Sequence, residues 1–354
     1  MGITKGLNWQ NIFIFLFLIA FPLGQIIRVG ILQPIDLIVG LAGVYVLIKK
    51  PAIPKVFKYL GSFIIFASFT WIFSIFIFQH VLVLYGLLYL FRLIAYYLFG
   101  IYVWNFVKIR KTNKTLLLNS LLVISLASAI FGWAQYFTVP SIKPFFSLGW
   151  DEHLFRLVGT FMDPPFIGLI IVFGLIISVV QFIEKKTKGM LAIAVFLLIS
   201  LAFTYSRGSY LALVAGLITV SYYKKDIKQL IFVVLGLVML IIILPTSGNH
   251  ILRISRVFSV LSRIDNYTKT IQIFKTSPVF GVGFDNLCLA KEKIDGGFNF
   301  FYHDCSGSDS SLLMVLATTG IVGFVVFIFA IGKIILYLKP DPCITILGSS
   351  FVAL

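Results

Sequence analysis

Three arginines lie within or between the apolar runs of the chain, and each is a candidate ligand for an anionic group. Arg207 lies in a Ser-Arg-Gly turn between two apolar runs, Arg263 lies in a long polar loop, and Arg92 lies in the middle of an apolar run. A guanidinium offers a rigid fork of N–H donors that fits a phosphate. At Arg207, the first amides of the following helix add to the positive field.

Each arginine also has a purely structural explanation. Arg207 can anchor the end of a membrane helix by extending its charge to the interface. Arg253, Arg256 and Arg263 share one face of a predicted helix, as in helices that lie on a membrane surface. Arg92 can be buried in a pair with Asp36 or against backbone carbonyls.

Two titratable groups near the end of the same loop are candidates for a general base. Asp309 comes just before a long apolar run, where a carboxylate can either cap the helix or accept a proton. His303 is the other candidate, because an imidazole titrates near neutrality.

Membrane helices must position these residues, because the composition excludes a soluble domain. The 354 residues are 60% hydrophobic and 12% charged, whereas soluble domains carry roughly twice that charge. The apolar runs lie at residues 12–27, 34–48, 60–78, 81–107, 116–137, 165–183, 190–203, 209–223, 230–244, 311–337 and from 345 onward. We predict an all-α polytopic membrane protein with about 11 transmembrane helices.

The positive charge indicates the orientation of these helices. Basic clusters lie on alternate connections, at residues 49–58, 108–114, 185–188 and 224–228. The positive-inside rule makes these connections and the amino terminus cytoplasmic. The net charge of +16 therefore reflects insertion into the cytoplasmic membrane, and we expect no nucleic-acid partner. The two long loops, 138–164 and 245–310, then face outward.

Several smaller features limit the interpretation. The three cysteines lack metal-ligand spacing, and although Cys288 and Cys305 share a loop and could pair, we expect no bond that shapes the fold. No metal or other cofactor is expected. The glycine-rich turn 280–286 is weak evidence for phosphate binding, and a nucleotide site is not expected there. The chain ends ten residues into its last apolar run, so we interpret it as lacking its natural carboxyl end.

Four segments, in this order, resemble the bacterial O-antigen ligase and O-antigen polymerase superfamily of membrane glycosyltransferases. They are residues 156–164, 205–208, 263–283 and 309–323, and the likeness covers about residues 156–337. The resemblance implies a GT-C-like all-helical fold. The size and apolar composition favour one integral membrane domain over residues 1–354, and the charge pattern makes residues 245–310 the long extracytoplasmic loop.

The resemblance also implies roles for particular residues. Arg207 and Arg263 match the arginines that hold the donor's diphosphate, and we add Arg156 and Arg92 as further candidates. The ligase pattern has a histidine as the proposed base before the last long helix. This chain has Asp309 there, which is closer to the polymerase-type members. His303 lies six residues earlier and can substitute only if the loop folds back.

The implied function is that of an inverting glycosyltransferase which works without a metal on the extracytoplasmic face. Its donor would be a glycan on undecaprenyl diphosphate in the lipid bilayer, and its acceptor a glycan, a lipid or a protein. A different class of function is a multi-span transporter or flippase for an anionic lipid or solute. Transporters usually show an internal repeat, and none is visible in this sequence.

Overall fold

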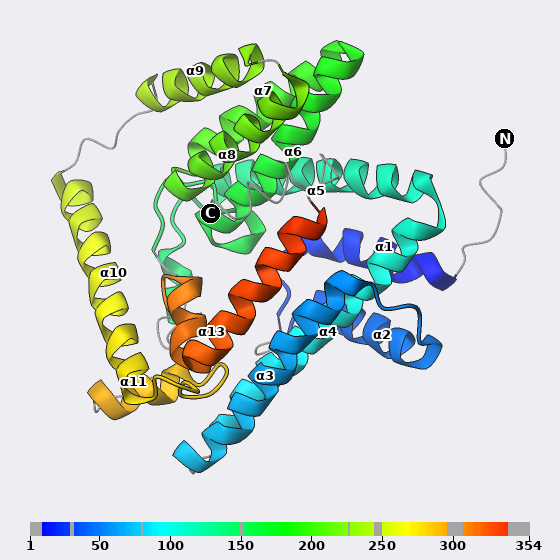
Figure 1. Cartoon of the computed structure of the whole chain (residues 1–354). Helices are drawn as coiled ribbons and strands as arrows, with labels where there is room; N and C mark the ends of the chain where they lie inside the picture. Colours follow the sequence, from blue (N-terminus) through cyan, green and yellow to red (C-terminus); the bar gives the residue numbers. More distant parts are fainter. Residues whose placement is uncertain are drawn as a thin grey trace. The chain divides into compact units, whose positions relative to one another are not determined.

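The structure, a computed structural model, describes residues 9–28, 32–78, 81–148, 150, 152–225, 227–243, 250–295 and 307–338. These residues form α-helices, short 3-10 turns and one isolated β-bridge between Ser141 and Leu154. The α-helices (Figure 1) are α1 (Trp9–Ala20), α2 (Pro34–Lys49), α3 (Lys55–Phe78), α4 (Val83–Ile109), α5 (Lys111–Thr138), α6 (Pro164–Lys185), α7 (Lys188–Phe203), α8 (Arg207–Lys224), α9 (Lys228–Ile243), α10 (His250–Thr276), α11 (Leu287–Asp295) and α13 (Ser311–Leu338). The predicted all-helical class is confirmed for this part of the chain.

The apolar runs overlap helices throughout the described residues. Among these, α3, α4, α5, α6 and α13 are long and apolar enough to cross a membrane, whereas α1, α7 and α9 are apolar but shorter. The predicted run from residue 345 lies outside the described residues. A multi-pass membrane protein is therefore supported, while the number of about 11 transmembrane helices stays a prediction.

The chain divides into two compact units. One contains residues 1–41, 103–245 and 338–354, and the other contains residues 42–102 and 246–337. The single integral domain expected from the sequence stays a prediction.

In the first unit, α6 is the central helix. It contacts α5, α7 and α8, and most of its apolar side chains are buried, with Leu175 and Ile176 almost fully so (Figure 1). Glycines allow this close packing: a Cβ at Gly174 would lie 2.3 Å from the Cβ of Ser125 on α5. Small residues at helix contacts are typical of membrane proteins, because packing and not water exclusion holds their helices together.

In the second unit, α13 is broken at Gly320, where the backbone has φ 67° and ψ −175°. The segment 278–283 fills the break. The amides of Val282 and Gly283 donate to the carbonyls of Ala317 and Thr318, at 3.0 and 2.9 Å. The amide of Ile321 donates in turn to the carbonyl of Pro278 at 2.9 Å. Backbone groups freed inside a membrane helix need such partners, so this loop segment and α13 form one structural element.

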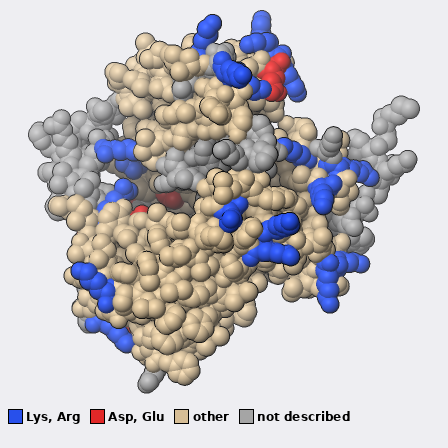
Figure 2. All heavy atoms as spheres, viewed as in Figure 1, with Lys and Arg blue, Asp and Glu red and all other residues tan. Residues whose placement is uncertain are grey.

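Charged side chains gather at the ends of the apolar helices. Figure 2 shows basic groups, with an acidic group among them, over the ends of α6, α7 and α8. The lysines there include Lys185, Lys186 and Lys224, and the Lys224 Nζ lies 2.6 Å from Glu184 Oε1. These are clusters that the positive-inside rule assigns to the cytoplasmic face, although the face itself stays a prediction.

Candidate functional site

The Ser-Arg-Gly turn begins α8 and exposes its arginine. Ser206 is the N-cap, and its hydroxyl oxygen accepts from the Ser209 amide at 3.3 Å. Tyr205 has a left-handed backbone with φ 51°, which turns the chain sharply after α7. Arg207 is the first helical residue and is exposed. The local hydrogen bonds therefore hold the turn, while the guanidinium stays available to a ligand.

The segment around Arg156 packs against the same turn. The Leu157 amide donates to the Phe203 carbonyl at 3.0 Å, and the Ser209 hydroxyl donates to the Pro165 carbonyl at 3.3 Å. Arg156 is half-buried, and its charge acts on the hydroxyl of Tyr210 in the first turn of α8. The first two of the four motif segments are thus brought together within one unit.

His153 is a further candidate residue, outside the motifs that are visible in the sequence. It lies in the loop before Arg156, and the Ile142 amide donates to its carbonyl at 3.1 Å. Burial, and secondarily the charge of Arg156, lower the pKa of His153 to about 4. The imidazole is therefore neutral near pH 7. In the sequence, only its position three residues before Arg156 indicates that His153 could belong to a site.

The other two motif segments meet in the second unit, where α10 holds the residues before α13. The Asn266 side-chain oxygen accepts from the Asp309 amide at 3.3 Å, and the Thr270 hydroxyl donates to the Ser308 hydroxyl at 3.2 Å. Arg263 lies one turn before Asn266, and residues three apart on a helix are neighbours on one face. Arg263 and Asp309 are both exposed. The structure therefore places the backbone of Asp309, a predicted base, against the face of α10 that carries Arg263, a predicted diphosphate ligand.

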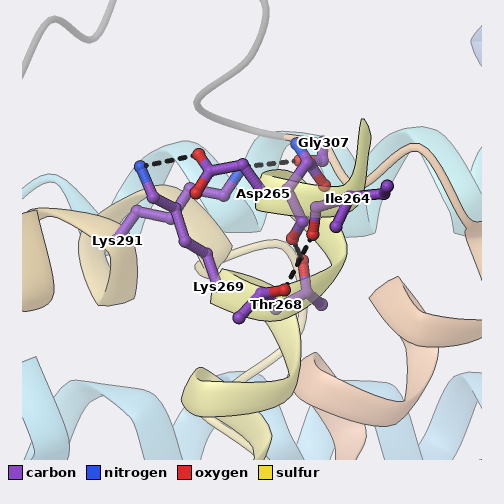
Figure 3. Close-up of polar contacts among 8 residues, drawn as sticks. Ile264, Asp265, Thr268, Lys269, Lys291 and Gly307 are labelled. Atoms are coloured by element: carbon purple, nitrogen blue, oxygen red, sulfur yellow. Dashed lines mark hydrogen bonds and ion pairs between the residues drawn. The ribbon is translucent and has the colours of Figure 1, made fainter. Parts of the chain in front are cut away.

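A lysine on α11 contacts the same segment from another side. Figure 3 shows the Lys291 ammonium reaching the Gly307 carbonyl, which it approaches to 2.8 Å. The figure also shows Asp265 and Lys269, which form an ion pair of 3.2 Å along α10. The segment 307–310 is thus held by two helices.

Asp309 is not the cap of α13, so one of its two predicted roles is wrong. The helix begins at Ser311, which makes Ser310 the N-cap, and the Ser310 hydroxyl oxygen accepts from the Leu313 amide at 3.4 Å. A serine directly before the helix takes the capping position from an aspartate one residue earlier. The Asp309 carboxylate is exposed and is not needed to start the helix.

Arg92 acts on an acidic group that the sequence did not suggest. Its charge acts on Asp285, in the turn between α10 and α11, and its guanidinium lies 5.7 Å from the ring centroid of Tyr89. Burial raises the pKa of Asp285 to about 8, although Arg92 opposes this shift. The Asp36 side chain accepts from the Gln33 amide at 2.9 Å, at the start of α2. The pairing of Arg92 with Asp36 stays a prediction, because the two residues belong to different units.

The structure also bears on two smaller expectations. The glycine-rich turn 280–286 has a structural role, because it packs closely against the backbone of α13. A Cβ at Gly281 would lie 2.4 Å from the carbonyl carbon of Thr318. Cys288 is disulfide-bonded, so this residue takes part in a pairing of the kind that the sequence left open. A count of cysteines does not show which of them meet in space. Cys305 and Cys343 lie outside the described residues.

The other predicted site residues lie outside the described residues or are divided between the two units. His303 lies outside the described residues, as do the side chains of Arg253 and Arg256. Arg207 and Arg156 belong to one unit, whereas Arg263, Asp309 and Arg92 belong to the other. Within the described ranges, no three His, Cys, Asp or Glu side chains form a group that could hold a metal ion.

The fold and these residues define an all-helical membrane protein with exposed cations and a carboxylate beside its apolar helices. Residues 192–328 match the family model described as O-Antigen ligase. The matched region runs from α7 into α13 and contains Arg207, Arg263 and Asp309, whereas Arg92 and Arg156 precede it. The resemblance to the O-antigen ligase and polymerase superfamily is therefore confirmed over this region. A search of curated proteins finds no match.

Proposed function

We propose that the protein is a membrane glycosyltransferase that takes a glycan from undecaprenyl diphosphate on the extracytoplasmic face of the cytoplasmic membrane. The family match supports the class of activity. The observation that carries the proposal furthest is the arrangement on α10. There Arg263 lies one turn from Asn266, and the Asn266 side chain accepts from the Asp309 amide.

The proposed reaction is a single displacement at the anomeric carbon of the donor. A bond forms from an acceptor hydroxyl oxygen to this carbon, and the bond to the diphosphate oxygen breaks. The electron pair leaves with the lipid diphosphate, whose charge Arg263 stabilises through forked hydrogen bonds. The family resemblance implies the same role for Arg207. The hydroxyl proton passes to Asp309, and the anomeric centre is inverted. This chemistry needs no metal, and Arg156 is a further cation near the Arg207 turn.

The proposed face of the membrane rests on two features. The lysine clusters at the ends of α6 and α8 are on connections that the positive-inside rule makes cytoplasmic. The disulfide at Cys288 is typical of an oxidising compartment, which agrees with an outward position for the loop between α10 and α13.

Asp309 favours a polymerase over a ligase within this proposal. The ligase pattern places a histidine where this chain has Asp309, and the polymerase-type members often have an acidic residue there. A polymerase would add glycan units to another lipid-linked glycan. A ligase would transfer a finished glycan to a lipid or protein acceptor.

The decisive experiment measures lipid-linked and surface glycan in cells with and without the gene. Loss of a polymerase should leave single lipid-linked units and no long chains, whereas loss of a ligase should leave long lipid-linked chains that never reach their acceptor. If both glycan pools are unchanged, the glycosyltransferase proposal is wrong.

Individual residues can be tested in correctly inserted protein. Arg207→Ala and Arg263→Ala should each lower transfer by about 100-fold or more, because each removes a stabilising donor from the developing diphosphate charge. Lysine at either position keeps the charge but loses the fork, so these variants should fall between alanine and wild type. Wild-type transfer in either alanine variant would remove that arginine from the site.

Separate variants distinguish the two candidate bases. Asp309→Asn should lower turnover by about 100- to 10,000-fold, the usual contribution of a general base, while His303→Ala should leave most of it. The opposite pattern would assign the proton transfer to His303.

The alternative of a transporter or flippase shares one feature with this structure. A broken membrane helix, such as α13 at Gly320, is a feature of many transporters, whose ions and substrates bind the freed backbone groups. In α13 the carbonyls of Ala317 and Thr318 are already taken by the amides of Val282 and Gly283. Uptake of lipid-linked glycan into sealed vesicles, without glycan transfer, would establish the alternative.

A further inference from the structure

Polar contacts hold the segment 307–310, in which Asp309 is exposed, to its neighbouring helices. Three consecutive residues each contact a side chain of another helix: Gly307 contacts Lys291, Ser308 contacts Thr270, and Asp309 contacts Asn266. The Ser310 hydroxyl then caps α13 at Leu313. Every residue of the segment is therefore tied to a helix through a polar contact.

These contacts leave the Asp309 side chain out of the network. Asn266 accepts from the backbone amide of Asp309, and Lys291 donates to a backbone carbonyl two residues earlier. The carboxylate itself is exposed. The network thus sets where the Asp309 backbone lies without occupying the group that would accept a proton.

The contacts also relate Asp309 to Arg263. On α10, Arg263, Asn266 and Thr270 follow one another at spacings of three and four residues, which place them on one helical face. Residues three or four positions apart on a helix have Cβ atoms about 5–6 Å apart. The helix that carries Arg263 therefore also fixes the backbone of Asp309, and the distance between cation and carboxylate depends on α10.

We propose that Asn266 and Lys291 are positioning residues, which hold Asp309 where it can accept the proton of the acceptor hydroxyl beside a diphosphate bound by Arg263. This inference rests on the proposed glycosyltransferase function. A base must lie within hydrogen-bond reach of its proton, and a displacement of about 1 Å can cost about 100-fold in rate. Neither residue touches the reacting atoms.

The test uses the full chain in lipid nanodiscs, with the lipid-linked glycan that accumulates in cells lacking the gene as donor. Asn266→Ala and Lys291→Met should each lower kcat by about tenfold while KM for the donor changes less than about twofold. Lys291→Arg keeps a donor for the Gly307 carbonyl and should restore most of kcat.

Two neighbouring residues provide matched controls. Lys293→Met removes the same charge from the same helix, but Lys293 donates to the Ile77 carbonyl at 3.1 Å and lies over the Phe78 ring. Thr268→Ala alters α10 at a residue whose hydroxyl only donates to the Ile264 carbonyl within its own helix. Both controls should keep wild-type kcat.

The possible outcomes separate this inference from the function on which it rests. If Asp309→Asn abolishes turnover but Asn266→Ala and Lys291→Met keep wild-type kcat, the positioning role is wrong and the proposed function stands. A loss that Lys293→Met shares, or that appears in KM and not in kcat, also overturns the positioning role. If Asp309→Asn keeps full turnover, the assignment of the base fails, and the positioning role fails with it.

Discussion

At the scale of single residues, neighbours in space decide what the candidate charges can do. Asp309 is not used as a helix cap because Ser310 takes that position, whereas Arg92 acts on Asp285 in a turn that follows α10. The first finding leaves Asp309 available for chemistry. The second gives Arg92 an acidic group on which its charge acts, while its role at a diphosphate stays a prediction.

Asp285 should make the stability of the protein depend on pH. Its pKa is raised to about 8 in the folded chain from an ordinary value of 3.8, so the folded state binds a proton that the unfolded state has released between these values. The free energy of unfolding should therefore fall as pH rises from about 4 to about 8. Asp285→Asn removes this contribution, and its unfolding temperature in detergent should exceed that of wild type most clearly above pH 8.

Comparison of the two chains at pH 5 and pH 8.5 separates this effect from a general change in stability. An equal difference between variant and wild type at both pH values would contradict the raised pKa of Asp285.

At the scale of elements, the break in α13 depends on a loop segment that precedes this helix in the sequence. The segment 278–283 fills the break, and a Cβ at Gly320 would lie 2.2 Å from the Val279 carbonyl oxygen. The backbone of Gly320 has a positive φ that other residues adopt only under strain. The break is therefore fixed by a glycine and by the loop that occupies it.

Gly320→Ala should destabilise the protein by at least about 1–3 kcal/mol, the cost of such backbone strain, with a further cost from the close carbonyl. The expected result is a lower unfolding temperature and a lower yield of inserted protein. Gly332→Ala is the matched control, because it lies in the same helix and a Cβ there meets nothing within 4 Å. An unchanged unfolding temperature in Gly320→Ala would mean that the break is not needed.

At the scale of the whole molecule, the distribution of charge predicts the face on which the site lies. Asp265 is exposed on α10, near the proposed site, and Lys185 is exposed at the end of α6. With the cytoplasmic clusters assigned by the positive-inside rule, the two positions should lie on opposite faces of the membrane.

Cysteines introduced at these positions test the orientation. A membrane-impermeant maleimide should label Asp265→Cys in intact cells, and should label Lys185→Cys only after the membrane is opened. The parent chain, with its own three cysteines, measures the background. Labelling of Lys185→Cys in intact cells would contradict the proposed topology.

Much of the architecture could be predicted from the sequence, because hydropathy and helical spacing are local properties. The apolar runs overlap helices throughout the described residues. The predicted helix with Arg253, Arg256 and Arg263 lies within α10, which ends at Thr276. The four motif segments could also be predicted from the sequence, since their order and residue types are visible along the chain. Arg207 was correctly placed at the start of a helix for the same reason.

Only the tertiary structure decided which of these residues share surroundings. It assigned Asp285 to Arg92, placed the glycine-rich turn in the break of α13, and joined Asp309 to Asn266 across 43 residues of sequence. It also revealed the neutral imidazole of His153 and the disulfide of Cys288. Such pairings depend on how helices pack, and the packing joins residues from distant parts of the chain that no local pattern relates.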